Sequence, residues 1–211
     1  MPIPLLVWIG VAVAVALIGG GVVIACLSGK SVLFIGMMGS GKTTAIHGFQ
    51  AVSKEDKNWK ADSSTPGTMS DSKEYDVLGF KACIDTSGGQ QFKKSWPPKI
   101  EKADWVFYFF DITQLDETRG KDHEKTRYWK LVKADLRDIA CVCKEKSKPV
   151  LVIATHTDRA YDKEKAKGYC EDILAELVSL NYGYVEGSLL NYASASKLSH
   201  LIEKKVEEIE K

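Results

Sequence analysis

The sequence predicts a three-layer α/β domain with a mainly parallel central sheet, preceded by a single transmembrane helix. Short apolar runs of strand length alternate with longer segments of helical spacing, which predicts the layered domain. A glycine-rich loop joins the first such strand to the first such helix, and an uncharged stretch near the N-terminus predicts the membrane helix. The 211 residues suffice for one such domain. We therefore expect an anchor at residues 1–29 and the domain at residues 30–211.

Composition narrows the choice of partners and compartment. The chain has 29 Lys and Arg residues against 28 Asp and Glu residues, so no charge excess indicates a nucleic-acid partner, and we expect none. The five cysteines show no metal-ligand pairing. Their odd number indicates reduced thiols and a domain in the cytosol.

The predicted transmembrane helix runs from Leu5 to Leu27, 23 residues without a charge. As a helix it would be about 34 Å long, enough to cross the hydrocarbon core. Lys30 follows it and every other basic residue lies beyond, which favours a single-pass membrane protein with its domain on the cytosolic side. Small residues at four-residue spacing would let two such helices approach closely and form a homodimer: Ala12, Ala16 and Gly20.

The sequence predicts three strands and one helix in the first half of the domain. Ser31–Ile35 is a β-favouring apolar run, and Thr44–Val52 has the spacing of a helix. The polar segment 54–72 contains Pro66-Gly67 and is predicted to be a loop. A short strand is expected at residues 74–77, and residues 80–84 alternate like another strand.

The second half continues the alternation. Trp105–Phe110 is a continuous apolar run, as expected for a strand covered on both faces, and a charged connection follows at residues 111–125. The remaining predicted elements are a helix at 126–144, a strand at 149–154, a helix at 162–180, a strand at 183–186 and a helix at 196–209.

The loop Gly36-Met37-Met38-Gly39-Ser40-Gly41-Lys42-Thr43-Thr44 fits a phosphate-binding pattern: glycine, four free positions, glycine, lysine and a hydroxyl residue. Small residues let backbone N–H groups turn inward around a phosphate chain. Lys42 would reach the β- and γ-phosphates, and the hydroxyl of Thr43 would bind a Mg²⁺ ion between them. The alternative is a glycine turn without a ligand.

A second motif, Asp85-Thr86-Ser87-Gly88, begins with an acidic residue and follows a predicted strand. In that position Asp85 would hold Mg²⁺ through water, and Gly88 would turn its amide toward the γ-phosphate. A further threonine ligand to the metal is expected in the polar loop, where Thr68 is preferred to Thr65.

These motifs, in this order, resemble the small GTPases of the Ras, Arf and bacterial Era-like group over residues 31–211. The phosphate loop ending is similar to that of Arf proteins, and Asp85 to Gly88 match the second-switch motif. Thr155-His156-Thr157-Asp158 stands where the family has Asn or Thr, Lys, any residue and Asp. Asp158 would accept hydrogen bonds from the guanine N1–H and amine, and so favour GTP over ATP. Ser188 matches the final motif, whose backbone contacts the guanine carbonyl.

The resemblance implies GTP/GDP and Mg²⁺ as ligands. The implied nucleotide-binding residues are Gly36, Met38, Gly39, Ser40, Gly41, Lys42, Thr43, Thr44, Thr155, His156, Asp158, Ser188 and Leu189. The implied metal ligands are Thr43, Thr68 or Thr65, and Asp85 through water. The implied catalytic groups are Lys42, the backbone of Gly88, and Gln90.

Three residues depart from the family pattern. His156 replaces a lysine that packs on the base, so we expect its ring to stack there instead, unless it only caps the strand end. Gly89 stands where Ras and Arf carry the glutamine that orients water, and Gln90 lies one position later. Met38 occupies a position where Ras has glycine. The sequence does not decide whether the chain is an enzyme. If it hydrolyses GTP to GDP and phosphate, we expect the intrinsic rate to be low unless a partner assists.

The sequence therefore predicts a membrane-anchored GTP/GDP switch with a protein effector or activating partner. Its layout, an anchor helix before an Arf-like domain, is similar to that of the signal recognition particle receptor β subunit. The alternative is a docking scaffold at the membrane that binds GTP without hydrolysing it. A protein that uses ATP is a third reading, which requires that Asp158 play no part.

Overall fold

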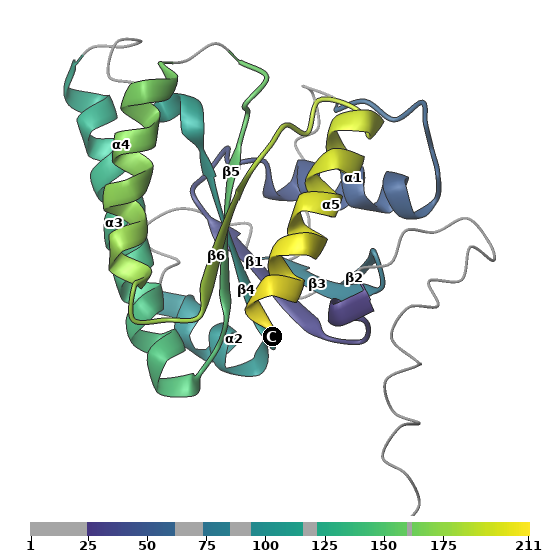
Figure 1. Ribbon diagram of the computed structural model, residues 1–211, viewed down its shortest axis with the longest axis horizontal. Coiled ribbons are helices and arrows are strands. Elements are labelled where there is room, and N and C mark those ends of the chain that lie inside the picture. The colour runs from purple at the N-terminus through teal and green to yellow at the C-terminus, as the bar shows by residue number, and fades with distance from the viewer. Residues whose placement is uncertain (1–24, 62–73, 85–93, 116–121, 160–161) are drawn as a thin grey trace, which may run out of the picture.

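The computed structural model describes residues 25–61, 74–84, 94–115, 122–159 and 162–211. These residues form one six-stranded sheet and the helices that cover it (Figure 1). The strand order is β2-β3-β1-β4-β5-β6, and all neighbouring strands are parallel except β2 and β3. The strands are β1 Ser31–Gly36, β2 Glu74–Val77, β3 Phe80–Ile84, β4 Trp105–Asp111, β5 Val150–Thr155 and β6 Tyr182–Glu186. The helices are η1 Ala25–Leu27, α1 Lys42–Ser53, α2 Trp96–Lys102, η3 Ile112–Gln114, α3 Asp122–Lys146, α4 Lys163–Leu174, η5 Ala175–Leu177 and α5 Tyr192–Ile209.

Helices cover both faces of the sheet. Figure 1 shows α1 and α5 on one face and α2, α3 and α4 on the other. Every residue of β4 is buried, as its continuous apolar sequence predicts for a central strand. On the α1 and α5 face, Phe34 packs against Phe107 and Phe109, with ring centroids 5.5 and 5.0 Å apart. The predicted three-layer, mainly parallel α/β architecture is confirmed.

Several helix boundaries differ from those predicted. The segment predicted as one helix over residues 162–180 is helical only to Leu174 and then tightens into the 3₁₀ turn η5, where the chain turns back toward β6. Helix α5 begins four residues earlier than predicted, because Asn191 caps it. The Asn191 side chain accepts from the Ser194 N–H, and the Ser194 hydroxyl bonds the Asn191 N–H in return.

Helix α2 was not predicted from the sequence. Its second and third residues are Pro97 and Pro98. Proline breaks a helix interior but is compatible with the first turn, whose N–H groups have no acceptor within the helix. The prolines therefore mark the start of α2.

The chain joins the domain at Ala25. Leu27 is completely buried in the core beneath α5, and Cys26 packs beside it. Lys30 forms an ion pair with Glu210 at the end of α5. Residues 5–24 of the predicted transmembrane segment lie outside the described residues. Of the helices that the structure describes, none combines the length and hydropathy that a membrane crossing requires.

Candidate functional site

The carboxyl ends of β1, β4, β5 and β6 lie at the same edge of the sheet, because these strands are parallel. Ligands of open α/β sheets bind outside this edge. The loops that leave it are Met37–Gly41 after β1, the turn at Asp111 after β4, His156–Asp158 after β5 and Gly187–Leu190 after β6. The described motifs are thus brought together at one edge.

The first glycine of the phosphate loop is required by the neighbouring strand. Gly36 has a φ of 133°, and a Cβ placed on it would lie 2.1 Å from the carbonyl oxygen of Phe109. The next residue, Met37, donates its N–H to that same oxygen at 3.1 Å. Because β4 passes so close, only glycine fits, and the chain turns away from the sheet at this point.

Lys42 places its positive charge inside the loop. Its side chain is only 6% exposed. Its Nζ donates to the carbonyl oxygens of Gly36 at 2.9 Å and Met37 at 2.7 Å, and lies 3.4 Å from the Ser40 hydroxyl. This ammonium therefore sits in a ring of loop oxygens, where phosphate oxygens would find a desolvated cation.

The N-terminus of α1 completes the anion-binding geometry. Gly41 precedes it with a φ of 82°, and none of the described side chains caps it. Thr43 and Thr44 lie half-buried in the first turn. A helix start of this kind offers N–H groups and the positive end of the helix dipole to an anion. Met38, in the same loop, is 76% exposed.

Thr155 joins the phosphate loop to the end of β5. Its buried hydroxyl lies 3.0 Å from the carbonyl oxygen of Ser40 and 3.0 Å from that of Phe110. A Cβ on Gly41 would meet Leu189, His156 and Thr155 at 3.5 to 3.9 Å. The phosphate loop therefore contacts both loops predicted to bind the base.

His156 lies beside this junction in a left-handed conformation, with a φ of 65°. Burial lowers the pKa of its imidazole, and the nearby Asp111 carboxylate only partly opposes this, so the ring is neutral at pH 7. Its Nδ1 lies 2.8 Å from the Thr155 hydroxyl. Since that hydroxyl has carbonyl acceptors for its own proton, the tautomer with Nδ1–H donating to Thr155 is favoured.

Asp158 is exposed and oriented by the loop after β6. The Ser188 hydroxyl donates to its Oδ1 at 2.6 Å, and the Leu190 N–H donates to the Ser188 hydroxyl oxygen at 3.2 Å. Across the described parts of the chain, no group donates to the other carboxylate oxygen, Oδ2. A carboxylate fixed in this way can accept hydrogen bonds from an incoming N–H group.

Asp111 belongs to the site but was not predicted. It is 3% exposed and accepts from the N–H and the hydroxyl of Thr113 at 2.9 and 2.7 Å, and from the Gln114 amide at 3.2 Å. Its carboxylate lies 3.7 Å from the His156 ring. The sequence signal was an acidic residue directly after a buried strand with threonine two positions later, a pattern typical of a turn in which the carboxylate accepts from the backbone.

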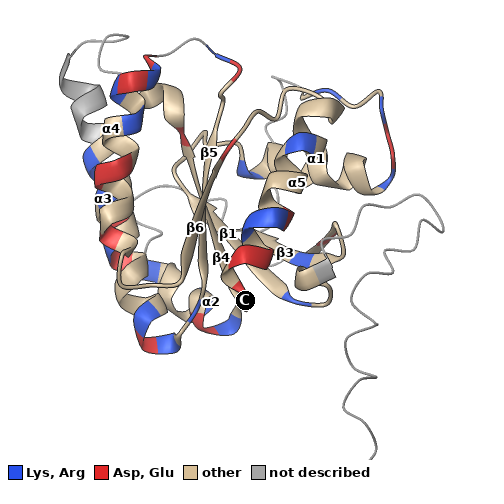
Figure 2. Ribbon diagram, viewed as in Figure 1, with Lys and Arg blue, Asp and Glu red and all other residues tan. Residues whose placement is uncertain are grey.

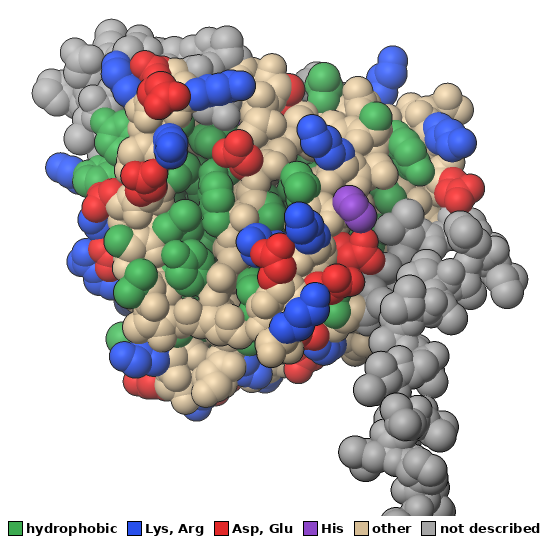
Figure 3. All heavy atoms as spheres, in the orientation of Figure 1, with side chains coloured by type: hydrophobic (Ala, Val, Ile, Leu, Met, Phe, Trp, Pro, Cys, Tyr) green, Lys and Arg blue, Asp and Glu red, His purple; other side chains and the backbone are tan. Residues whose placement is uncertain are grey.

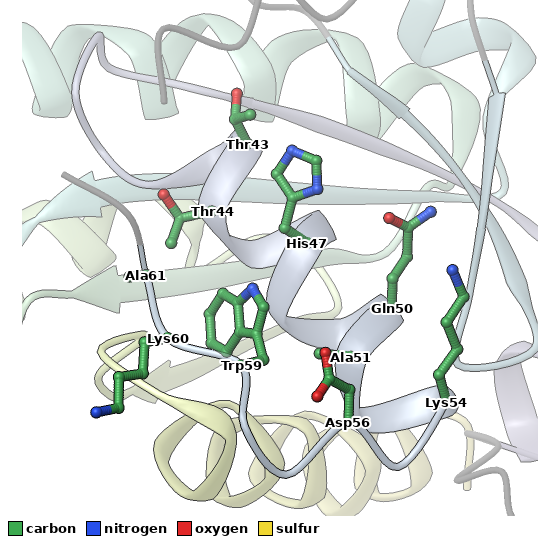
Figure 4. Close-up of a pocket in the computed structure, with 10 residues that line it drawn as sticks. All are labelled: Thr43, Thr44, His47, Gln50, Ala51, Lys54, Asp56, Trp59, Lys60 and Ala61. Atoms are coloured by element: carbon green, nitrogen blue, oxygen red, sulfur yellow. The ribbon is translucent and has the colours of Figure 1, made fainter. Parts of the chain in front are cut away.

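A cavity of about 340 Å³ runs along α1 beside the predicted metal ligand Thr43. Figure 4 shows His47, Gln50 and Lys54 along α1, with Trp59 and Asp56 on the segment that follows it. This segment is attached to the β6–α5 loop, since Tyr192 N–H donates to the Trp59 carbonyl at 3.0 Å. The cavity thus extends from the phosphate loop along the outer face of α1.

The structure tests only part of the predicted site. The predicted metal ligands Thr65, Thr68 and Asp85 lie outside the described residues, as do Gly88, Gly89 and Gln90. The phosphate loop, Thr155 to Asp158, Ser188 and Leu189 are described and share one edge. The fit of a nucleotide is therefore judged from these residues.

The fold is that of small GTPases. The structure of the Arl6 (BBS3) small GTPase from Trypanosoma brucei, which has a bound nucleotide analogue, GppNp, is similar with a TM-score of 0.58 and 16% identity over 86% of this chain and 99% of that one. The GDP complex of the signal recognition particle receptor β subunit from Chaetomium thermophilum is similar with a TM-score of 0.53 and 16% identity, over 84% of this chain and 98% of that one. No protein-family model and no curated protein matches the sequence.

Proposed function

We propose that this chain binds guanine nucleotides and acts as a GTP/GDP conformational switch. The observation that carries the proposal is the join between two recognition elements at one sheet edge. The Lys42 ammonium, held by the carbonyl oxygens of the loop, suits a phosphate chain, and the Asp158 carboxylate held by Ser188 suits the hydrogen-bond donors of guanine. Thr155 connects the two through its contact with Ser40.

Different described residues would bind the phosphates, the metal ion and the base of the nucleotide. Lys42 and the first turn of α1 would hold the phosphates, and Thr43 would bind the Mg²⁺ ion that neutralises charge between the β- and γ-phosphates. The neutral ring of His156 and the side chain of Leu189 lie where the base would be enclosed. Asp158 would then select guanine, because adenine offers no donor pair at the same positions.

The chain would work at a membrane and hydrolyse GTP slowly. The predicted anchor is shortened at its end, because Leu27 is buried in the domain core, and the uncharged residues 5–24 support an anchor that holds the domain on the cytosolic side. Gly89, where a water-orienting glutamine stands in Ras and Arf, supports slow hydrolysis or hydrolysis that a protein partner stimulates. It equally favours the rival function, a GTP-bound docking scaffold. Multiple-turnover phosphate release, measured with the full chain, distinguishes a slow enzyme from a scaffold that releases none.

The test of guanine recognition replaces one hydrogen-bond acceptor of the protein by one donor. Asp158→Asn replaces an acceptor of the guanine N–H groups by an amide whose NH₂ suits the extra carbonyl of xanthine. We expect GDP affinity to fall by about a hundredfold and xanthosine diphosphate affinity to rise, measured with fluorescent nucleotides. Asp162→Asn is the matched control, since asparagine caps α4 as well as aspartate does.

Two outcomes would count against the proposal. Equal loss of GDP binding in both variants would mean that Asp158 acts only on stability. Displacement of bound GDP by equimolar ADP in the unmodified chain would remove the guanine assignment.

A further inference from the structure

One edge of the sheet carries strand backbone that no described residue pairs. In β6, Asn181 accepts from Val150 at 3.1 Å and Gly187 donates to Ala154 at 2.9 Å, so alternate residues from 181 to 187 face β5. The backbone groups of Tyr182, Tyr184 and Glu186 therefore point away from the sheet. In Figure 1, β6 is the foremost strand, with α4 to its left and α5 to its right.

The two edge strands differ in their protection against pairing. The exposed residues of β2 are Glu74 and Asp76, and charges of this kind discourage another strand from adding. Strand β6 instead carries half-buried tyrosines at positions 182 and 184, without lysine or proline, and its one exposed charged residue, Glu186, is the last of the strand. By sequence, β2 is a protected edge and β6 is an open one.

Apolar surface flanks the open edge. Figure 3 shows hydrophobic side chains gathered between α4 and β6. Val178, which follows η5 in the turn before β6, is 77% exposed, and Leu174, Leu180 and the two tyrosines are partly exposed. A hollow of about 370 Å³ lies between α4 and β6, with Leu174 and Tyr184 in its lining. Apolar surface beside unpaired strand backbone is typical of an interface.

We propose that β6 pairs antiparallel with β6 of a second copy of this chain, which makes one continuous sheet across a two-fold axis. An isologous interface of this kind requires a surface that is complementary to itself. With the axis at Tyr184, the outward N–H and C=O groups of Tyr184 in one chain pair with the C=O and N–H groups of Tyr184 in the second chain. Tyr182 of each chain then lies opposite Glu186 of the other.

The charges of α4 are complementary under the same axis. In the first half of α4 the hollow is lined by Lys163, Glu164 and Lys167, a net positive charge, and in the second half its one charged lining residue is Glu171. Figure 2 shows both signs of charge along this helix. Cys170 Sγ lies 3.5 Å from the Tyr184 hydroxyl, so the middle of α4 is level with the axis. The two α4 helices run antiparallel beside each other, and Lys167 of one copy approaches Glu171 of the other.

The position at which the described chain begins is compatible with this arrangement. A two-fold axis between antiparallel edge strands is perpendicular to the sheet, so the same face of both copies points the same way. Cys26 and Leu27 lie on the face that carries α5. The first described residues of both copies therefore lie on the same side of the continuous sheet. The pairing itself involves no nucleotide-binding residue.

The test measures self-association of the full chain in detergent by sedimentation velocity, with hydrogen exchange of the segment 180–187. We expect a reversible dimer in which the amides of Tyr182, Tyr184 and Glu186 exchange more slowly as concentration rises. Tyr182→Lys and Val178→Asp should each weaken the dimer about tenfold or more. Asp76→Lys, which places the same lysine on the other edge strand, should leave it unchanged. Thermal unfolding checks that all variants fold.

Two results would overturn the proposal. One is a monomer at all concentrations. The other is a dimer that survives both β6-edge substitutions but is lost when Gly20→Leu closes the small-residue stripe of the N-terminal segment, because association would then run through that segment.

Discussion

Gly36 and Gly39 both have positive φ angles, but their surroundings differ. A Cβ on Gly36 would lie 2.1 Å from the Phe109 carbonyl, whereas a Cβ on Gly39 would meet nothing within 4 Å. We predict that Gly39→Ala costs about 1 kcal/mol, the strain of a left-handed alanine. Gly36→Ala adds a clash with the backbone of a central strand and should cost at least about 3 kcal/mol. Denaturant unfolding followed by circular dichroism measures both.

Comparing the Gly36→Ala and Gly39→Ala variants distinguishes the cost of backbone strain from the cost of the steric clash with β4. If both alanine variants lose the same small amount of stability, then β1 and β4 can move apart and the close approach at Gly36 is not required. Because Gly39 lies within the phosphate loop, its substitution can still weaken nucleotide binding without unfolding the domain.

At the residue scale, site residues could be predicted from the sequence where they belong to a local pattern. The loop from Gly36 to Thr44 was predictable because each glycine, lysine and hydroxyl has a fixed place in a contiguous motif. The place of the buried Asp111 in the site was not, since its contact with His156 depends on where β4 and β5 end relative to each other. The lowered pKa of the His156 imidazole likewise arises from burial that only the fold creates.

At the element scale, the segment between α1 and residue 62 is attached to the loop that follows β6. The Trp59 ring lies so close to α1 that a Cβ on Gly48 would be 2.9 Å away. Ala61 donates its N–H to the Leu190 carbonyl at 2.9 Å. Leu189 beside it contacts the phosphate loop. Motion of this segment should therefore change how firmly the base is enclosed.

We predict that Trp59→Ala speeds nucleotide release by about tenfold, because the β6–α5 loop loses the packing that holds it. It should also lower stability by about 2 kcal/mol, less than a fully buried tryptophan would. Trp129→Ala is the matched control: Trp129 is half-buried between α3 and α4, against Tyr169 at 5.6 Å between ring centroids. Release of a fluorescent GDP analogue into excess unlabelled GDP measures the rate.

An equal acceleration in the Trp129 variant would show that release follows global stability. Unchanged release in the Trp59 variant would show that the segment packs beside the site without influencing it.

Elements were predictable where apolar periodicity was strong and uninterrupted. The strands at 74–77 and 80–84 have the expected bounds. Helix α2 was missed because it is seven residues long and opens with two prolines, which a periodicity argument counts as breakers. The break after Leu174 was missed because residues 162–180 keep an amphipathic pattern through the turn that η5 makes toward β6.

At the scale of the whole molecule, alternation predicted the layers and the parallel sheet, but strand order needed the structure. The order places β1 between β3 and β4, so that the loop after β1 emerges in the middle of the sheet edge. It also places β6 at the opposite end from β2, where its edge is uncovered by described residues. Sequence spacing contains no information on which strand lies at an edge.

The N-terminal segment makes the last prediction, which concerns the whole chain. Residues 5–27 contain no charge, and the described domain begins with the turn Ala25–Leu27, in which Leu27 is buried. We predict that the full chain stays in the membrane pellet after alkaline carbonate washing. The double substitution Val13→Arg with Leu17→Arg should release it, because each arginine at the centre of a spanning helix costs about 3 kcal/mol. Val13→Leu with Leu17→Ile is the control and should stay in the pellet. Protease on the cytosolic side should digest the domain. If the unmodified chain is found in the wash, or if the arginine variant is retained like the control, these residues do not span a membrane and the switch would act away from one.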